Sequence, residues 1–390
     1  MTGGADRRSV LAAGGAALAA GAVQARTVQA RAAWGPAPPM LIVNALGGLD
    51  DPNIWGAENA TGSALPDTLH APLSRRVLAD AHAAGLGAVN VTLGYVAGPM
   101  EPFEYSVREI GIWDWRIRNQ SRDLIKVLTA ADILAARRDG KVGIIYGFQN
   151  GAMLGDKAER VEIFADLGMR VIQLTYNPAN QIGDGATAPA NRGLSAFGRE
   201  VVERLNASRV MVDLSHSGER TCLEAARVSK QPVSINHTGC RALNDVPRNK
   251  SDAELRLVAS RGGFVGLYFM PFLNPSSNAS AEDVVAHIDH AVNICGEDHV
   301  GIGTDGGTTG VDDMAAYRLH IAKQIADRRK AGLGAPGEKD DTLPLVVDLQ
   351  GPDQFRRLAG LLRGRGYSAL RIEKIMGLNF LAYARAVWGA

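Results

Sequence analysis

The sequence has few cysteines and no excess of charge of either sign. Among its 390 residues, the 42 basic and 41 acidic side chains nearly cancel, so nucleic acid is not expected as a partner. Three cysteines at scattered spacing fit neither a disulfide framework nor a zinc ribbon. At most one disulfide can form, and buried free thiols are the simpler interpretation. The cysteines are Cys222, Cys240 and Cys295.

Long apolar runs are also absent, so the sequence predicts no stable membrane insertion. The N-terminal segment carries a shorter run. Arg7 and Arg8 precede about a dozen Ala, Gly, Leu and Val residues, and small-residue sites end at Ala25 and Ala32. This pattern predicts a twin-arginine export signal over residues 1–33, the export machinery as a partner, and a periplasmic or secreted protein. A disordered basic tail is the alternative.

The remaining residues, 34–390, read as a single domain in which short β-rich runs alternate with amphipathic stretches. Eight runs are apolar throughout, which is typical of parallel strands covered on both faces. We therefore predict an α/β fold, a (β/α)8 TIM-like barrel. A doubly wound open sheet is the alternative, but no Gly-rich nucleotide loop follows the first run. The runs are 40–46, 87–94, 142–148, 170–176, 210–216, 232–237, 264–270 and 300–305.

Two further segments surround this pattern. A long excursion, 306–350, follows the eighth run, and a helical region starts at Pro352. Residues 94–107, after the second run, are expected to form a wall of a pocket.

Polar side chains stand where the predicted strands end. His216, His237 and Asp305 end the fifth, sixth and eighth strands, Gln149 follows the third and Tyr176 ends the fourth. In a parallel barrel these ends form one face, where catalytic groups gather. Two neutral imidazoles with an oxygen ligand suit zinc or a similar divalent ion. The set predicts a metal site, although for each histidine taken alone a packed core residue is the favoured interpretation.

Other polar residues have two interpretations. Asp213 is either a hydrogen-bond partner that orients His216 as a metal ligand or a buried structural carboxylate. Asp50 and Asp51 either reach the barrel mouth or form a solvated loop pair, which is the favoured interpretation. His287 and His290 have a spacing that suits a metal, but helices lie outside such a barrel, which favours packing.

The sequence resembles the membrane (renal) dipeptidase family of zinc metallopeptidases. The stretches that carry the resemblance run from about Ala165 to Phe380. They are "GLSAFGREVVERLNASRVMVDLSHSGERT", "PVSINHTGCRALNDVPRNKSD", "HIDHAV", "DHVGIGTD" and "IMGLNF". The resemblance implies a barrel of the metallo-dependent hydrolase type with two zinc ions, which hydrolyses dipeptides with a free carboxylate. It maps two zinc ligands onto His216 and His237, the substrate-carboxylate arginine onto Arg241, and the catalytic aspartate onto Asp305.

The chain also departs from this family. Where family members carry His-x-Asp after the first strand, this sequence has Leu46 and Gly48. Gln149 stands where a glutamate bridges the two metals, and a neutral amide brings no charge to offset their repulsion. Tyr176 replaces the histidine that steadies the tetrahedral intermediate. The departures predict one Zn2+ ion rather than two.

The predicted function is therefore that of an exported metal-dependent hydrolase from a divergent branch of the family. His216 and His237 would hold the metal with Gln149 as a neutral third ligand. Asp305 would deprotonate water, Tyr176 would stabilise the oxyanion, and Arg241 would bind the carboxylate of a peptide-like substrate. A metal-poor binding protein or a periplasmic maturation enzyme using the same pocket is the alternative. A homodimer is left open.

Overall fold

The computed structural model describes residues 40–54, 71–330 and 338–389. The described residues all lie in one compact unit, Trp34–Ala390. The expected export signal, 1–33, lies outside the described residues, so it stays a prediction.

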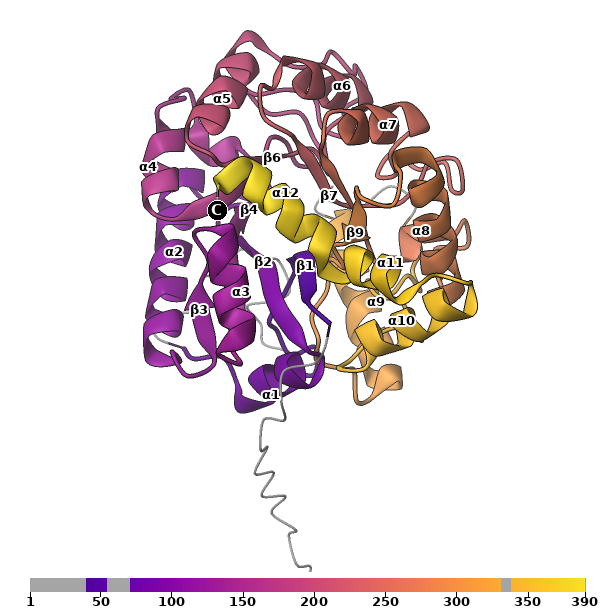
Figure 1. Ribbon diagram of the computed structural model, residues 1–390. Coiled ribbons are helices and arrows are strands. Elements are labelled where there is room, and N and C mark those ends of the chain that lie inside the picture. The colour runs from indigo at the N-terminus through magenta and orange to yellow at the C-terminus, as the bar shows by residue number, and fades with distance from the viewer. Residues whose placement is uncertain (1–39, 55–70, 331–337, 390) are drawn as a thin grey trace, which may run out of the picture. The chain divides into compact units, whose positions relative to one another are not determined.

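The described strands form one parallel sheet that curves into a barrel (Figure 1). The order is β1-β2-β4-β5-β6-β7-β8-β9, and the short β3 pairs with β4 outside this path. The strands are β1 (Ile42–Gly47), β2 (Leu86–Leu93), β3 (Leu124–Lys126), β4 (Val142–Phe148), β5 (Met169–Gln173), β6 (Met211–Asp213), β7 (Ser234–Thr238), β8 (Phe264–Leu267) and β9 (Val300–Ile302).

Side chains and turns close the barrel between β1 and β9. The Asn44 amide donates to Thr304 Oγ1 at 2.8 Å and accepts from the Thr304 backbone N–H at 2.8 Å. The Asp305 N–H donates to the Leu46 carbonyl at 3.0 Å. The predicted eight-stranded TIM-like barrel is confirmed, and its seam is held by a buried asparagine as well as by backbone groups.

All eight predicted strands are present, but β5, β6, β8 and β9 each end three residues earlier than predicted and β2 ends one residue earlier. Tyr176, His216 and Asp305 each lie three residues beyond the last residue of β5, β6 and β9, because the apolar pattern continues into the turns. Of the polar strand-end residues only His237 lies within a strand, β7. The three-residue β3 was not predicted, since its run is too short to be recognised.

Helices surround the strands (Figure 1). Several begin where sequence chemistry places a cap: Ser251 and Glu254 form a capping box at α7, and Ser280 and Asp283 form one at α8. The helices are α1 (Arg75–Ala83), α2 (Pro102–Asn119), α3 (Ala130–Arg138), α4 (Arg160–Asp166), α5 (Ala196–Ala207), α6 (Glu219–Val228), α7 (Asp252–Ser260), α8 (Ala281–Cys295), α9 (Met314–Lys330), α10 (Gln354–Gly364), α11 (Ala369–Glu373) and α12 (Asn379–Trp388).

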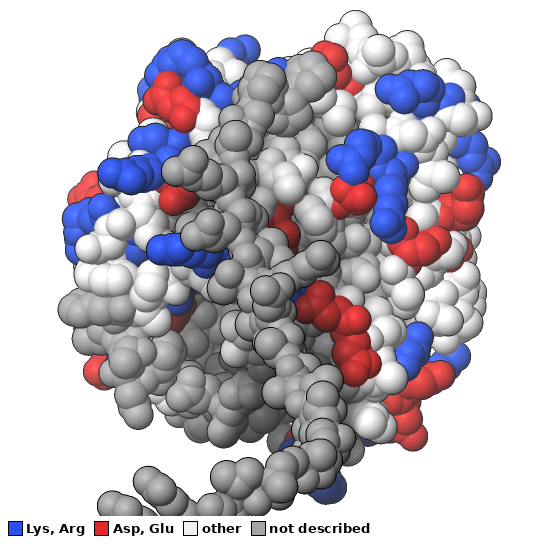
Figure 2. Space-filling view, turned by 90° about the horizontal axis from the view of Figure 1, so that it is seen from below, with Lys and Arg blue, Asp and Glu red and all other residues white. Residues whose placement is uncertain are grey.

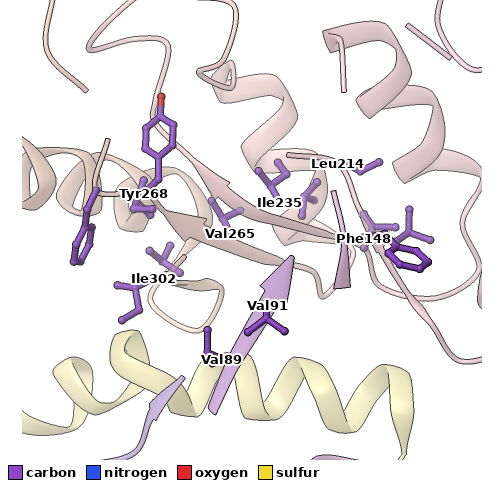
Figure 3. Packing of buried hydrophobic residues seen from close by; sticks show 14 of the residues in the cluster. Val89, Val91, Phe148, Leu214, Ile235, Val265, Tyr268 and Ile302 are labelled. Atoms are coloured by element: carbon purple, nitrogen blue, oxygen red, sulfur yellow. The ribbon is translucent and has the colours of Figure 1, made fainter. Parts of the chain in front are cut away.

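The core is apolar, and α12 covers one end of it. Side chains from β2, β4, β7, β8 and β9 pack together, among them Val91, Ile235 and Val265 (Figure 3). A second buried cluster joins α12 to strand residues that include Val43 and Phe264. In Figure 1 α12 (yellow) crosses the strands. The expected helical region after Pro352 is therefore present as α10 to α12, and it completes the core.

The surface and the thiols agree with the composition. Lys and Arg are interspersed with Asp and Glu over the coloured part of the face in Figure 2. Cys222, Cys240 and Cys295 are free and buried, which confirms the simpler interpretation. Among the described residues, no helix has the length and apolar content that a membrane span requires.

Candidate active site

The two histidines at neighbouring strand ends are in contact. His237 lies in β7, and His216 lies in the turn after the neighbouring β6. Their Nε2 atoms are 2.9 Å apart, and both side chains are buried. The sequence placed these residues at one face, and the structure brings them together there.

The residues after β5 orient the His216 ring. Asn177 Oδ1 lies 2.7 Å from His216 Nδ1, which favours the tautomer with the proton on Nδ1. The Tyr176 ring stacks on the imidazole with a centroid distance of 4.3 Å and an interplanar angle of 24°. His216 Nε2 then carries no proton, and its lone pair faces His237. Sequence reasoning missed Asn177, although it directly follows the predicted Tyr176.

Both imidazoles are held neutral. Burial lowers the pKa of His216 and of His237 well below the ordinary value, and the nearby positive charges of Arg248 and Lys250 act in the same direction. Neutral imidazole nitrogens are the form that binds a metal ion or accepts a proton.

Asp213 is a structural carboxylate. Its Oδ1 accepts from the Ser215 N–H at 3.0 Å, from the Ser215 hydroxyl at 2.5 Å and from the Asn236 N–H at 3.1 Å. The Ser215 hydroxyl accepts in turn from the His237 N–H at 3.1 Å. Asp213 therefore fixes the residue immediately before each histidine, Ser215 before His216 and Asn236 before His237.

Asp305 lies in the turn after β9, at the mouth. Its φ of 59° is left-handed, a conformation that aspartate tolerates better than most residues. Burial raises the pKa of Asp305 to about 6, against the opposing effects of the Arg248 charge and a hydrogen bond from the Gln149 side chain. The Gln149 amide also donates to Thr92 Oγ1 at 2.6 Å. Gln149 thus contacts Asp305 and Thr92, and its expected role as a metal ligand stays a prediction.

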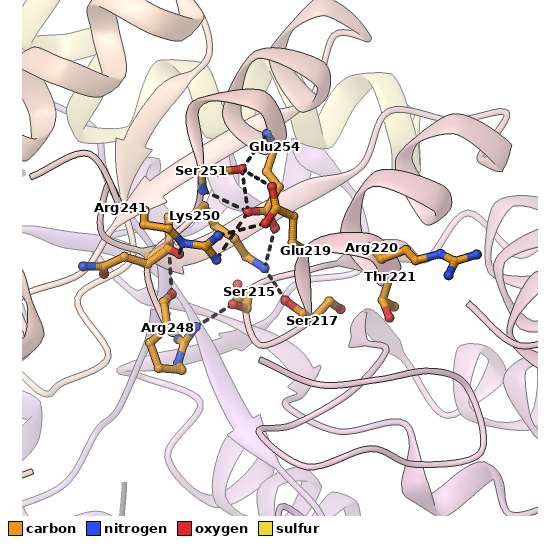
Figure 4. A network of polar contacts seen from close by, with 12 residues as sticks. Ser215, Ser217, Glu219, Arg220, Thr221, Arg241, Arg248, Lys250, Ser251 and Glu254 are labelled. Atoms are coloured by element: carbon orange, nitrogen blue, oxygen red, sulfur yellow. Dashed lines mark hydrogen bonds and ion pairs between the residues drawn. The ribbon is translucent and has the colours of Figure 1, made fainter. Parts of the chain in front are cut away.

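Arg241 lies in a different network from the other predicted residues (Figure 4). Its Nη1 donates to Glu219 Oε2 at 2.9 Å, and its Nε donates to the Asn249 carbonyl at 3.1 Å. Glu254 lies 3.9 Å from the same guanidinium and also pairs with the buried Lys250 at 3.1 Å. A guanidinium that already holds a carboxylate is poorly placed to bind that of a substrate.

Arg248 is the arginine that lies beside the histidines, and the expected role of Arg241 stays a prediction. Its Nη1 donates to the Ser215 carbonyl at 2.6 Å, and its Nη2 lies 3.5 Å from the His237 carbonyl. The side chain is only 5% exposed, and its charge acts on Asp305 and on both imidazoles. No described carboxylate lies within 4.0 Å of its nitrogens.

The two arginines are separated by a loop that leaves the mouth and returns. An isolated β-bridge between Cys240 and Lys250 brings the two arms of this loop together. Arg241 on the outgoing arm turns away from the mouth, and Arg248 on the returning arm points back towards it. Both arginines lie in the same stretch that resembles the family. Their distances from His237 along the chain do not show which of them lies beside the histidines. Two buried backbone carbonyls next to His216, at Ser215 and Ser217, accept from Arg248 and Lys250.

The donor set fits one divalent cation better than two. The two facing Nε2 atoms supply neutral nitrogen ligands, and the buried His237 Nδ1 has no hydrogen-bond partner among the described residues. The described residues contain no group of three or more His, Cys, Asp or Glu side chains arranged around a common point. At the expected first metal position, Leu46 is a buried apolar side chain and Gly48 has no side chain. The chemistry of the donors therefore supports a site built on His216 and His237.

The helical histidines take structural positions. His287 is buried and accepts from the Cys240 N–H at 2.8 Å, and its Nε2 donates to the Leu273 carbonyl at 2.9 Å. His290 lies 2.7 Å from Asp252. Packing, the interpretation that the sequence favoured, is what the structure shows for both.

Comparisons with known proteins agree with this geometry. Residues 100–333 match the membrane dipeptidase family, peptidase family M19. An amidohydrolase from Pseudomonas aeruginosa is 32% identical, with a TM-score of 0.72 over 90% of this chain and 97% of that chain. A solved M19 metallopeptidase, dipeptidase AC, superposes with a TM-score of 0.69 over 90% of this chain and all of its own, at 20% identity.

A curated relative gives the same assignment over a shorter region. A dipeptidase from Schizosaccharomyces pombe is 33% identical over 218 residues, which are 53% of this chain and 52% of the relative. The chain thus spans about half the length of that protein. The family match covers more than half of the chain and includes the β4 to β9 strand ends at which the histidines and Asp305 lie. The chain belongs to the membrane dipeptidase family, and it is a dipeptidase-type hydrolase.

Proposed function

We propose that the protein is an exported, metal-dependent hydrolase that cleaves a dipeptide, or a dipeptide-like amide with a free carboxylate. The observation that carries the proposal is the meeting of four groups at one barrel mouth. Two neutral imidazoles lie 2.9 Å apart at Nε2. The buried Arg248 and the Asp305 carboxylate interact electrostatically with each other, and Arg248 also acts on the imidazoles. This set combines ligands, a base and an anion-binding group.

His216 and His237 would hold the metal, with Gln149 as the candidate for a third, neutral ligand. A divalent ion bound there would act as a Lewis acid on the scissile carbonyl group. Zn2+ suits imidazole ligands, and one ion agrees with the available donors.

Asp305 would take the proton from the attacking water. A base works best with a pKa near the working pH, and the Asp305 pKa of about 6 satisfies this condition. Tyr176 would donate its phenol hydrogen to the developing oxyanion, since its ring lies against His216.

Arg248 would bind the substrate carboxylate in place of Arg241. Its guanidinium is buried, and two of its nitrogens are fixed by backbone carbonyls. A fixed fork recognises a carboxylate with little loss of side-chain freedom. The lack of a described carboxylate within 4.0 Å leaves its charge available for a substrate.

A dipeptide panel tests the proposal. The purified protein is assayed with Zn2+ present and again after chelation, and its metal content is measured by elemental analysis. Hydrolysis that is lost on chelation and restored by Zn2+ supports the proposal. If no dipeptide is cleaved while a carboxylate ligand still binds in a way that depends on Arg248, the protein is a binding protein that uses the same pocket.

A further inference from the structure

A large cavity opens beside Asp305, on the β1, β2 and β9 side of the barrel mouth. Its volume is about 760 Å3, which is enough for a small organic ligand. Thr92, Thr304 and Asp305 line its inner end, and Trp113 of α2 and Tyr317 of α9 line its walls. The pocket wall expected at 94–107 is provided instead by later residues of α2, which begins within that segment.

The cavity lining has an excess of negative charge. Among the described lining residues, three carry a carboxylate, Asp50, Glu109 and Asp305, and one carries a guanidinium, Arg116. Arg116 is already engaged, because its Nε donates to the Ala71 carbonyl at 3.0 Å and its guanidinium lies over the Trp113 ring at 5.0 Å. A ligand that fills this space is therefore expected to carry positive charge.

Asp50 is the lining carboxylate on which no described cation acts, whereas Arg116 acts on Glu109 and Arg248 acts on Asp305. Among the described residues, no Lys, Arg or His nitrogen lies within 4.0 Å of its oxygens. Asp50 is exposed in the cavity, and the surrounding protein raises the pKa of its carboxyl group, against a hydrogen bond from its own backbone N–H. The next residue differs, because Asp51 accepts from the Asn53 N–H at 3.0 Å and from its amide at 2.8 Å.

Two glycines make room for the Asp50 carboxylate. A Cβ atom at Gly48 would lie 2.3 Å from Asp50 Oδ1, and one at Gly307 would lie 3.0 Å from it. The carboxylate is thus folded back over the position where the resembling family has an aspartate side chain. Gly48 is therefore part of how the Asp50 side chain is placed in the cavity.

A second polar group in the lining also has no partner. Thr309 is 6% exposed, and its hydroxyl makes no hydrogen bond with any described residue. It follows Gly307 by two residues on the same loop. A buried hydroxyl without a partner is costly, and an ammonium group is a donor that would satisfy it.

We infer that Asp50 forms a subsite for an ammonium group of the substrate, with Thr309 as an additional acceptor. This inference rests on the proposed function and assigns the substrate a positive charge on the β1–β9 side of the scissile bond. The ammonium is either the free α-amino group or a basic side chain. A metal ion is a weaker candidate for Asp50, because the described residues near it supply no imidazole or thiolate ligand.

Paired aspartate variants and three peptides test the subsite. The variants are Asp50→Asn and, as a matched control, Asp51→Asn, which keeps the acceptor oxygen for Asn53. The peptides are Ala-Ala, N-acetyl-Ala-Ala and N-acetyl-Lys-Ala. The readout is kcat/KM where the parent cleaves the peptide, and a calorimetric Kd where it does not. Thermal melting and elemental analysis accompany each variant.

We expect the parent to favour a peptide with an ammonium group over N-acetyl-Ala-Ala by about 10- to 100-fold, the scale of one charged hydrogen bond. Asp50→Asn should remove this preference and leave N-acetyl-Ala-Ala within about threefold of the parent, well below that scale. Asp51→Asn should keep the preference. Preference for Ala-Ala identifies the α-amino group as the ligand, and preference for N-acetyl-Lys-Ala identifies a side chain.

Three results overturn the inference. They are an unchanged preference in Asp50→Asn, an equal loss for charged and capped peptides, and a loss of bound metal in Asp50→Asn. Failure of the proposed function looks different, because then no peptide is cleaved and yet the Kd values still report whether Asp50 selects the ammonium group. Cleavage without charge preference leaves the proposed function standing and removes the subsite.

Discussion

Arg248 and Arg241 share a loop and a charge but differ in burial and in partners. Arg248 is buried beside the histidines, whereas Arg241 is only partly buried and is paired with Glu219. This difference makes the two arginines a natural comparison for the carboxylate-binding role.

Arg248→Lys should weaken the binding of a carboxylate ligand by about 1.5–3 kcal/mol, because lysine keeps the charge but loses the fixed fork. Arg241→Lys should leave that binding close to the parent value. Calorimetry with one dipeptide measures both, and thermal melting verifies that each variant is folded. Equal losses in the two variants would argue against the assignment of Arg248.

Asp305→Asn is nearly isosteric and cannot take a proton from water. Turnover should fall roughly 100-fold or more, the usual scale of general-base assistance, while ligand binding stays largely intact. Steady-state kinetics and calorimetry on the same preparation separate the two effects. Turnover as fast as in the parent would show that another group is the base.

At the residue scale, the sequence predicted the groups that lie at strand ends. His216, His237 and Asp305 follow apolar runs, and the barrel geometry brings such positions to one face. Arg248 and Asn177 lie in loops, whose course depends on tertiary contacts that no period in the sequence reports. The same limit explains why the sequence favoured a solvated loop position for Asp50, whose side chain lines the cavity.

At the scale of elements, one buried histidine of α8, His287, links this helix to the turn after β7 and to the segment that precedes α8. His287 accepts from the Cys240 N–H and donates to the Leu273 carbonyl. Burial lowers the pKa of His287 to about 4, from an ordinary value of 6.5. Between about pH 4 and pH 6.5 the unfolded chain therefore binds a proton at this histidine more readily than the folded chain does.

The folded state should consequently lose stability as the pH falls from about 6.5 towards 4, by about 3 kcal/mol from this group once the pH lies below both values. His287→Gln keeps an acceptor and a donor but has no titrating ring, so its unfolding free energy should fall less over this interval. Denaturant unfolding at a series of pH values measures the slope. An unchanged slope in His287→Gln would refute the explanation.

The elements themselves were more predictable than their junctions. Apolar runs identified all eight barrel strands, and Ser or Asp caps marked helices such as α7 and α8. The short β3 and the exact strand ends were not predictable, because a turn with buried apolar residues has the same pattern as a strand.

At the scale of the whole molecule, the number of bound metal ions should reflect the loss of ligands at the expected first metal position. The chain has Leu46 and Gly48 there, and the neutral Gln149 contacts Asp305. We expect at most one tightly bound divalent ion per chain after dialysis, measured by elemental analysis. His216→Ala should abolish its retention. A value close to two would mean that other groups rebuild the first position.

Export should depend on both arginines of the pair before the apolar run. Changing Arg7 and Arg8 to lysine keeps the charge, so a general secretory route would tolerate the change, whereas twin-arginine export should fail and precursor should accumulate in the cytoplasm. Cell fractionation followed by immunoblotting measures the distribution. Unchanged export would remove the twin-arginine interpretation.

The seam of the barrel has a consequence for the order of events during synthesis. Asn44 and Thr304 meet across 260 residues of chain, and α12 covers strand residues that were made far earlier. Contacts so distant in sequence form slowly and late. Until α12 has been translated, Val43 and Phe264 lack their cover, so a nascent or truncated chain presents apolar surface to chaperones and proteases. Completion of the fold is therefore a post-translational event, and any route that carries folded cargo has to wait for the last helix.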